Sequence, residues 1–377
     1  MSNATFSDSK KHYEILDGLR GIAAIMVVML HILEIFAGGD HTKLMINHGY
    51  LAVDFFFLLS GFVIAHAYDD RWNNMTIGQF FKRRLIRLHP LIIAGMTLGG
   101  IFFYFSESSV LFPIVGETPV WKLILVMLIG YTLIPVPLSL DIHGWGEMHP
   151  LNGPAWSLFY EYVGNILYAL FLRKTSTTVL SILVLLSGAF LAYYTISSPQ
   201  GDIIGGWSLT SEQLTIGFTR LLYPFLAGLL LHRIFKPMSL KNGFLLCSIL
   251  LIVVLAMPRI GGKEHLWMNG TYESIVIIIF IFPLILFLGA SGNIQGKIST
   301  KVCNFLGDIS YPLYITHFPV LYVYYAWVIN NKVTLDQAWP VGVGILISSI
   351  LVAWLLLKYY DIPVRKWLTQ KYMNPKH

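Results

Sequence analysis

The stretch LDGLRGIAAIMVVMLHILE at residues 16–34 opens a series of long apolar runs. A helix that crosses a bilayer needs about 20 predominantly apolar residues. Such runs lie near residues 19–37, 49–68, 89–105, 156–172, 178–197, 215–232, 243–258, 273–290, 308–329 and 340–358. The sequence therefore predicts an all-α integral membrane protein with about ten transmembrane helices.

The composition agrees with a membrane protein and excludes several other classes. Of the 377 residues, 55% are hydrophobic and 12% are charged, whereas an ordinary soluble protein has about 25% charged residues. So few charges cannot cover a water-facing surface, which excludes a soluble globular or a disordered protein. The net charge of +6 comes from basic residues between apolar runs, a pattern that indicates contact with membrane lipid and not with nucleic acid.

Loop charges predict the orientation of the chain. With a cytoplasmic N-terminus and ten helices, 20 of the 26 lysines and arginines lie on the cytoplasmic side, as the positive-inside rule expects. The apolar segment near 120–138 ends at two prolines, and counting it as a span would place the basic cluster at 233–241 outside. We therefore expect it to be re-entrant or interfacial, and both termini to be cytoplasmic. We also expect one membrane-embedded domain over residues 1–377, with a core of roughly 13–367 and no appended soluble domain.

Two histidines are predicted to lie near the middle of the bilayer. His31 follows Arg20 by eleven residues, which is about 16 Å along a helix. His317 lies nine residues beyond Asp308, or about 14 Å. Glu34 shares a helix face with His31. Ionisable groups at this depth are costly and mark functional sites by default, although a neutral histidine bonded to a neighbouring helix is the alternative.

A dense basic cluster, KRRLIR at residues 82–87, precedes the third apolar run. Arg83, Arg84 and Arg87 there can set the orientation of the protein and meet lipid headgroups. Arginine is also the preferred residue for bidentate contacts with phosphate. The sequence shows neither a phosphate-binding glycine-rich loop nor a dinucleotide fingerprint, so this cluster is the candidate for holding phosphates.

Several polar residues lie at the predicted outer side. Asp54 is near the outer end of the second run, where we expect it to be partly wetted. Trp156 and Glu161 open the fourth run, and Glu161 lies deeper. We expect His143 and His149, in the loop before that run, to be solvated. No metal site is indicated.

Five segments in order resemble the acyltransferase family 3 integral membrane proteins, which move acyl groups onto sugars and related acceptors. The matching segments are LDGLRGIAA with Arg20 and His31, GYLAVDFFFLLSGF at 49–62, RRLIR at 83–87, WSLFYE at 156–161 and GDISYPLYITH at 307–317. The resemblance covers nearly the whole chain. It implies a bacterial inner-membrane protein, a cytoplasmic acetyl-CoA donor and an acceptor on the outer side that is a carbohydrate or a lipid-linked saccharide.

Combining the resemblance with the residues gives a hypothesis for the site. Arg83, Arg84 and Arg87, with Arg20, bind the donor phosphates. His31 acts as general base, Glu34 orients it, and His317 polarises the thioester carbonyl or binds the acceptor. The expected acceptor-binding residues, which shape the acceptor entrance, are Asp54, Trp156 and Glu161.

Other functions remain open from the residues alone. A proton-coupled transporter could use His31 and Glu34 as a relay, although the chain shows no internal repeat of the kind common in carriers. A non-catalytic lipid-binding protein would give no reason for the two histidines. The identity of the acceptor, the length of the acyl group and the oligomeric state are not specified by the sequence.

Overall fold

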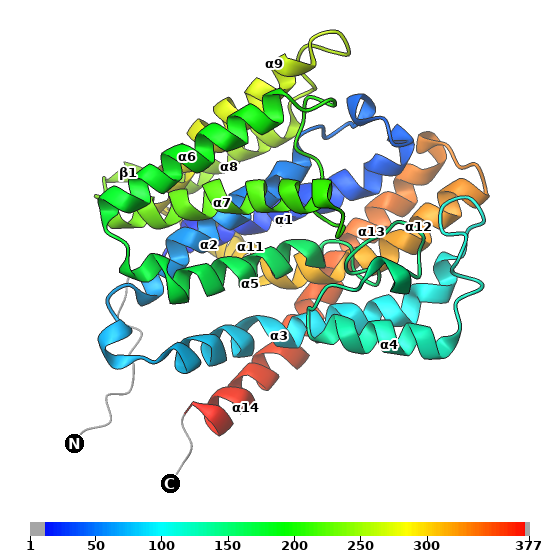
Figure 1. The fold of residues 1–377 in the computed structure, drawn as a ribbon, viewed down its shortest axis with the longest axis horizontal. Helices are drawn as coiled ribbons and strands as arrows, with labels where there is room; N and C mark the ends of the chain where they lie inside the picture. Colours follow the sequence, from blue (N-terminus) through cyan, green and yellow to red (C-terminus); the bar gives the residue numbers. More distant parts are fainter. Residues whose placement is uncertain (1–11, 374–377) are drawn as a thin grey trace.

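The computed structural model describes residues 12–373, which fold into a bundle of helices (Figure 1). The α-helices are α1 (Glu14–Glu34), α2 (Ala52–Tyr68), α3 (Ile77–Phe102), α4 (Val120–Tyr131), α5 (Ala155–Leu170), α6 (Thr177–Ile196), α7 (Ser211–Ile234), α8 (Gly243–Ala256), α9 (Leu266–Thr271), α10 (Phe282–Ser291), α11 (Lys297–Thr316), α12 (Phe318–Asn330), α13 (Leu335–Leu356) and α14 (Ile362–Tyr372). Two π-helical segments, Tyr272–Ile281 and Leu357–Asp361, join α9 to α10 and α13 to α14. The strands β1 (Leu240–Lys241) and β2 (Gly292–Asn293) form one short parallel pair.

The loops gather on two opposite faces of the bundle (Figure 1). The terminal face carries the start of α1, the end of α14, the loops at 69–76 and 171–176, and the β1–β2 pair; there Arg233 joins Asp69 to the carbonyl of Thr175. The opposite face carries the loops at 38–48, 106–119, 132–154, 197–210 and 257–265; there His48 bonds the carbonyl of Met257. Most helices run between these faces.

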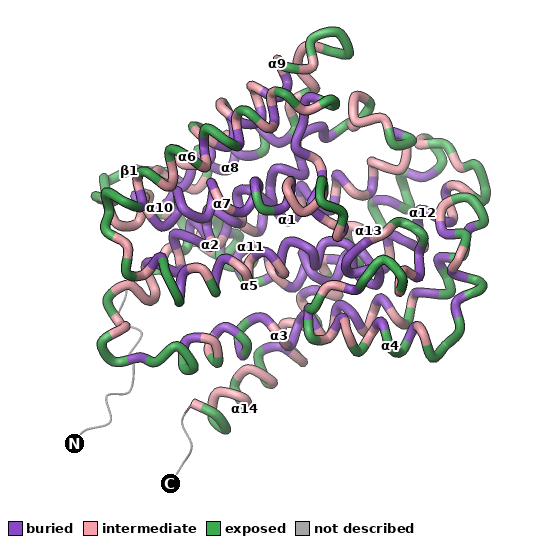
Figure 2. The backbone as a smooth tube through the Cα atoms, viewed as in Figure 1, coloured by how far each residue is buried: buried purple, intermediate pink, exposed green. Residues whose placement is uncertain are grey.

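The all-α membrane fold predicted from the sequence is confirmed. Seven of the described segments are long and apolar enough to cross a membrane, and α4, α8 and α12 are shorter apolar helices. The predicted span at 308–329 consists of the end of α11 and most of α12, which meet at His317. Figure 2 shows the buried residues concentrated along the central helices and the exposed ones along the outer helices and loops.

Two helix boundaries differ from the predicted ones. The third helix begins at Ile77 and not near residue 89, because Thr76 and Gln79 form a capping box that starts α3 before its basic cluster. The last span continues beyond residue 358 through the π-helical turn into α14. Hydropathy identified the apolar part of each helix and missed its polar extension at the terminal face.

The apolar segment near 120–138 contains only the short helix α4. Its 12 residues give a length of about 18 Å, less than the hydrocarbon core of about 30 Å. α4 packs on α3, where Thr97 and Tyr131 share a hydrogen bond of 2.8 Å. Beyond it the chain turns at Leu133, which has a positive φ of 60°. This arrangement agrees with a segment that does not cross the membrane.

Small residues bring the central helices α2 and α7 into backbone contact. A Cβ atom on Gly61 would collide with the carbonyl oxygen of Phe225, and one on Gly228 would collide with that of Leu58. In membrane proteins such small residues allow two helices to pack closely. Van der Waals contact between them then stabilises the pair, because lipid provides no hydrophobic driving force for helix association. This close contact fixes the position of α2 relative to α7.

Candidate functional site

The structure brings His31 and His317 together. Their ring centroids are 5.6 Å apart and the rings are nearly parallel, with an interplanar angle of 22°. His31 comes from the last turn of α1, and His317 lies at the break between α11 and α12. The edge of Phe318 faces the His31 ring at 4.9 Å. Residues far apart in the sequence thus form one imidazole pair.

One carboxylate and one tyrosine fix the orientation of His31. Its Nδ1 lies 2.9 Å from Oε1 of Glu34. The hydroxyl of Tyr325, on α12, donates to the same Oε1 at 2.6 Å and lies 2.6 Å from the carbonyl oxygen of His31. With Nδ1 of the neutral ring donating to Glu34, Nε2 keeps the lone pair. The sequence analysis missed Tyr325, since nothing in its local pattern separates it from neighbouring aromatic residues.

The second histidine is buried and held by the main chain. The Nδ1 atom of His317 lies 3.1 Å from the carbonyl oxygen of Leu313 and 2.9 Å from that of Tyr314. Its Nε2 is buried with no hydrogen-bond partner among the described residues. With Nδ1–H donating to the carbonyls, Nε2 is an acceptor without a donor, which suits a hydroxyl group brought next to His31.

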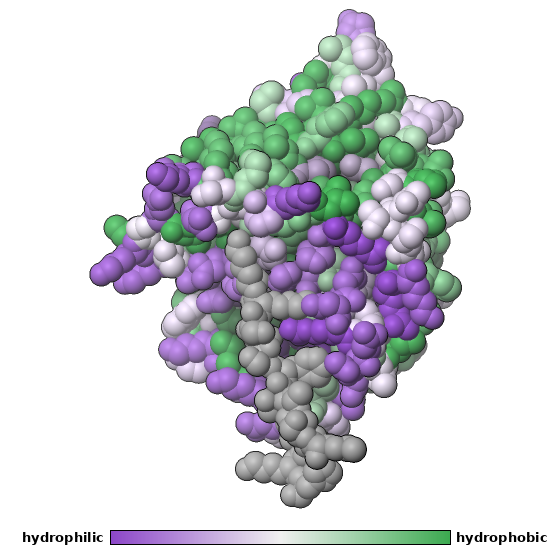
Figure 3. Space-filling model, turned by 90° about the vertical axis from the view of Figure 1, so that its left-hand side faces the viewer, coloured by the Kyte–Doolittle hydropathy of each residue, from purple (hydrophilic) through white to green (hydrophobic). Residues whose placement is uncertain are grey.

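A cavity of about 510 Å³ extends from the terminal face toward this pair. It begins between the starts of α1 and α14 and ends at Ser157, Phe56 and Tyr314. Arg20, Arg84 and Arg87 line it, whereas Arg83 does not. Figure 3 looks onto the terminal face and shows hydrophilic side chains gathered over its lower half, with apolar ones above.

Carboxylates pair with two of the three predicted arginines in this cavity. Arg20 binds Asp17 at 2.9 Å and donates from Nε to Ser310 at 2.8 Å. Arg84 binds Glu161 at 2.6 Å. Each guanidinium has five N–H donors, so these pairs leave donors for a ligand, and the Nε atom of Arg84 is buried without a partner among the described residues.

Glu161 lies in the cavity wall and not at the opposite face. Besides Arg84, it accepts a hydrogen bond of 3.0 Å from Ser60. Sequence analysis grouped Glu161 with the acceptor entrance because its helix starts at the predicted outer side. The helix α5 descends toward the terminal face, however, and Glu161 lies far enough along it to meet α3.

Asp54 is fully buried, so the expectation that it is partly wetted was wrong. It forms an ion pair of 2.7 Å with Arg220 of α7, and Arg220 also donates to the carbonyls of Tyr50 and Gly205. The guanidinium lies 5.1 Å from the ring of Trp156, which is itself buried. A buried charge needs a partner of this kind, and hydropathy had placed Arg220 inside an apolar run where no pairing could be foreseen.

An aromatic layer separates the cavity from the imidazole pair. Phe56 and Tyr314 pack edge to face with centroids 5.3 Å apart, and the hydroxyl of Tyr314 shares a hydrogen bond of 2.8 Å with Ser157. The Tyr314 ring is 6.1 Å from that of His317. Neither histidine lines the cavity, so Tyr314 borders both the cavity and the pair.

The loop before α5 is buried, which contradicts the expected solvation of its histidines. His143 and His149 are each about 1% exposed, and burial lowers the pKa of both to about 4. Glu147 accepts a hydrogen bond of 2.6 Å from Tyr322, and burial raises the pKa of its carboxyl to about 8. The loop packs between α12 and the segment around Phe112, which removes it from water.

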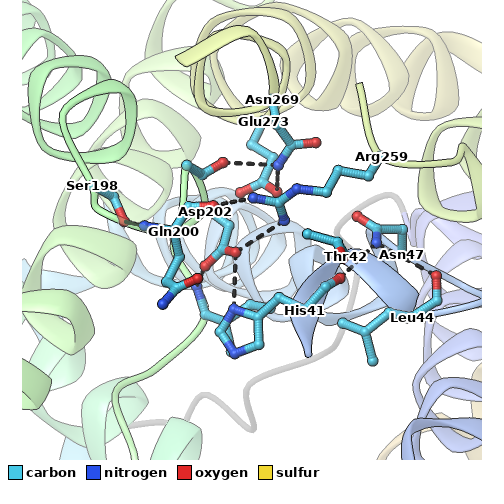
Figure 4. Close-up of polar contacts among 12 residues, drawn as sticks. His41, Thr42, Leu44, Asn47, Ser198, Gln200, Asp202, Arg259, Asn269 and Glu273 are labelled. Carbon is cyan, nitrogen blue, oxygen red and sulfur yellow. Dashed lines mark hydrogen bonds and ion pairs between the residues drawn. The ribbon is translucent and has the colours of Figure 1, made fainter. Parts of the chain in front are cut away.

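A second polar cluster joins three loops at the opposite face (Figure 4). Asp202 accepts from His41 at 2.9 Å and from Arg259 at 3.1 Å. In the same cluster, Asn269 donates to Glu273 at 2.6 Å. These contacts tie the loops at 38–48, 197–210 and 257–265 together, and they explain why this face is ordered around the outer ends of α1, α7 and α9.

Comparison with known proteins agrees with this architecture. The family described as "Acyltransferase domain" matches residues 13–358. "Protein 2 in picA locus" of Rhizobium radiobacter is 36% identical over 170 residues, which cover 42% of this chain and 82% of that protein. "O-acetyltransferase OatA" of Staphylococcus aureus (strain NCTC 8325 / PS 47) is 22% identical over 374 residues, covering 93% of this chain.

The chain spans only 57% of the length of the staphylococcal protein. No solved structure gives a significant match. The family match covers most of the chain and includes every helix that lines the cavity except α14. The chain therefore belongs to the acyltransferase domain family, and it is an integral membrane protein of the bacterial type.

Proposed function

We propose that this protein is an O-acetyltransferase that moves an acetyl group from acetyl-CoA, bound at the terminal face, to a hydroxyl group of a saccharide at the opposite face. The observation that carries the proposal is the imidazole pair, oriented by Glu34 and Tyr325, beyond the end of an arginine-lined cavity. The excess of basic residues in the loops of the terminal face favours a cytoplasmic location for that face. In a bacterium this corresponds to the inner membrane.

The donor fits the cavity by charge and by direction. Arg20, Arg84 and Arg87 supply N–H donors for its phosphates, and the cavity reaches Tyr314, whose ring is 6.1 Å from that of His317. For the thioester to reach His31, Tyr314 must turn away from Ser157 and open the aromatic layer. The acceptor reaches His31, whose side chain is 20% exposed, from the opposite face.

The reaction needs one proton carrier. Nε2 of His31 takes the proton from the acceptor hydroxyl as the oxygen attacks the thioester carbonyl. The new C–O bond forms, the C–S bond breaks, and the departing thiolate receives the proton back from His31. Nε2 of His317 accepts a hydrogen bond from a second hydroxyl group of the saccharide and so orients the acceptor. Glu34 stabilises the imidazolium that exists between the two proton transfers.

Release of free thiol tests the proposal directly. Purified protein is offered acetyl-CoA and a panel of oligosaccharides, and the expected result is saccharide-dependent release of coenzyme A. His31→Ala should lower the rate by about 10²-fold or more, whereas His265→Ala, at an exposed loop residue, should not change it. A transporter would consume no acetyl-CoA. Near-normal thiol release by a well-folded His31→Ala protein would overturn the role of His31. If none of the saccharides in the panel triggers thiol release, the proposed acceptor class is overturned.

A further inference from the structure

The last helix supplies a part of the cavity that no sequence motif indicated. Asp361 ends the π-helical turn Leu357–Asp361, and Arg365 lies one turn later on α14. Both residues line the same cavity as Arg87. π-Helical turns inside α-helices often occur at functional sites. Here the turn places a carboxylate and a guanidinium at the terminal end of the cavity.

Asp361 holds Arg365 and leaves two buried atoms without partners. Nη2 of Arg365 lies 2.8 Å from Oδ2 of Asp361. Oδ1 of Asp361 and Nε of Arg365 are buried with no hydrogen-bond partner among the described residues. The side chain of Asp361 is 3% exposed, so water does not freely solvate it. Native proteins rarely leave such groups unsatisfied. A ligand that satisfies both atoms must donate a hydrogen bond to the Asp361 oxygen and accept one from the Arg365 nitrogen.

A phosphate next to a hydroxyl group has that pattern. Phosphate oxygens only accept hydrogen bonds and favour arginine, while a neighbouring hydroxyl can donate to a carboxylate. Arg87, on the wall formed by α3, adds a cation with no carboxylate partner recorded among residues 12–373. The positive charge near Asp361 is therefore larger than the single ion pair suggests.

We propose that Asp361 and Arg365 bind the phosphorylated ribose at the nucleotide end of the acyl donor. Nε of Arg365 donates to the 3′-phosphate, and Oδ1 of Asp361 accepts from the adjacent 2′-hydroxyl. The inference rests on the proposed function, and it adds α14 to the expected phosphate-binding residues, of which Arg83 does not line the cavity. It also fits the direction of the cavity, because the nucleotide and the thioester are opposite ends of the donor.

Equilibrium binding to the purified full chain tests the inference without depending on turnover. The probes are acetyl-CoA and acetyl-3′-dephospho-CoA, which differ only in the 3′-phosphate. The unchanged protein should bind acetyl-CoA at least about tenfold more tightly, because hydrogen bonds between charged groups are strong. Arg365→Gln should lose this preference and bind the two probes alike. Arg365→Lys, which keeps the charge but lacks the Nε–H donor, should recover part of it.

Lys366→Gln is the matched control, because Lys366 is exposed on the same helix and does not line the cavity. It should keep the full preference. An unchanged preference in Arg365→Gln, or no preference in the unchanged protein, would overturn the inference and leave the terminal end of the cavity to a lipid phosphate. If binding shows the expected pattern but no saccharide releases thiol, the proposed function fails while the nucleotide site stands.

Discussion

Tyr325 connects Glu34 and the main chain of His31 through a single hydroxyl group. A carboxylate that accepts this bond has its position fixed relative to the imidazole, and small errors in the position of a base are costly for catalysis. Tyr325 is about 1% exposed, so no water can replace the hydroxyl group without a rearrangement. We therefore assign Tyr325 as a positioning residue.

Tyr325→Phe should lower kcat about tenfold and leave the KM for acetyl-CoA unchanged, because the ring still fills its place while Glu34 loses a donor. The measurement is steady-state thiol release. Tyr324→Phe is the control, since Tyr324 directly precedes Tyr325 on α12 and its side chain points about 100° away around the helix axis. Equal effects of the two substitutions on kcat, or a change confined to KM, would contradict the positioning role.

The sequence could single out ionisable residues that lie deep in an apolar run, and few other candidate site residues. His31 and His317 were found because an ionisable group in an apolar run is conspicuous. Asp54 was noticed without its partner, since pairing with Arg220 depends on how α2 and α7 cross. Arg365 lies in a polar stretch beyond the last apolar run, and only the three-dimensional arrangement places it in the cavity.

Helices α2 and α7 depend on two glycines for their close approach. Gly61 and Gly228 each face a carbonyl oxygen of the other helix, and the Arg220–Asp54 pair joins the same two helices. Apolar runs predicted that both helices exist, because length and hydropathy determine insertion. Their contact could not be predicted, since glycines are also frequent in transmembrane helices without such a role.

Gly228→Leu should force α2 and α7 apart and destabilise the protein by about 1–3 kcal/mol or more, as overpacking does in other cores. The expected result is a lower Tm in detergent and a lower yield of folded protein. Gly344→Leu makes the same chemical change on α13, where an added Cβ would meet no atom within 4 Å. Similar Tm values for the two variants would show that the α2–α7 contact is not tight.

At the scale of the whole molecule, the two faces differ in where their charged side chains lie. The terminal face opens a cavity with paired arginines. The opposite face packs several acidic groups into its loops, as at Asp202, which pairs with His41, and at Glu147, which pairs with Tyr322. The loop at 132–154 looked like a solvated connection in the sequence, because its burial arises from helices distant along the chain.

Stability should fall as the pH rises toward 8, because Glu147 keeps a proton in the folded state. Its pKa is raised by burial from an ordinary 4.5 to about 8, so the unfolded chain releases this proton earlier and gains relative stability between those values. The loss is at most about 1.4 kcal/mol per pH unit. Thermal unfolding between pH 6.5 and 8.5 measures it.

Glu147→Gln should flatten that pH dependence, since the amide imitates the protonated acid. Glu117→Gln, at an exposed loop residue, should leave the slope unchanged. Glu147→Gln keeps His143 and His149, whose lowered pKa values add an opposite slope as the pH falls through about 6.5, so the difference between this variant and the unchanged protein isolates the contribution of Glu147. An identical slope with and without Glu147 would show that its carboxyl is ionised in the folded protein.

The ring contact between Phe56 and Tyr314 has a consequence for the cell as well as for the reaction. Because these side chains lie between the cavity and the imidazole pair, they separate the coenzyme site from the imidazoles among the described residues while Tyr314 keeps its hydrogen bond to Ser157. On the proposed reaction only the two-carbon acyl fragment crosses, while the nucleotide carrier stays behind. An export step for the activated donor is then unnecessary.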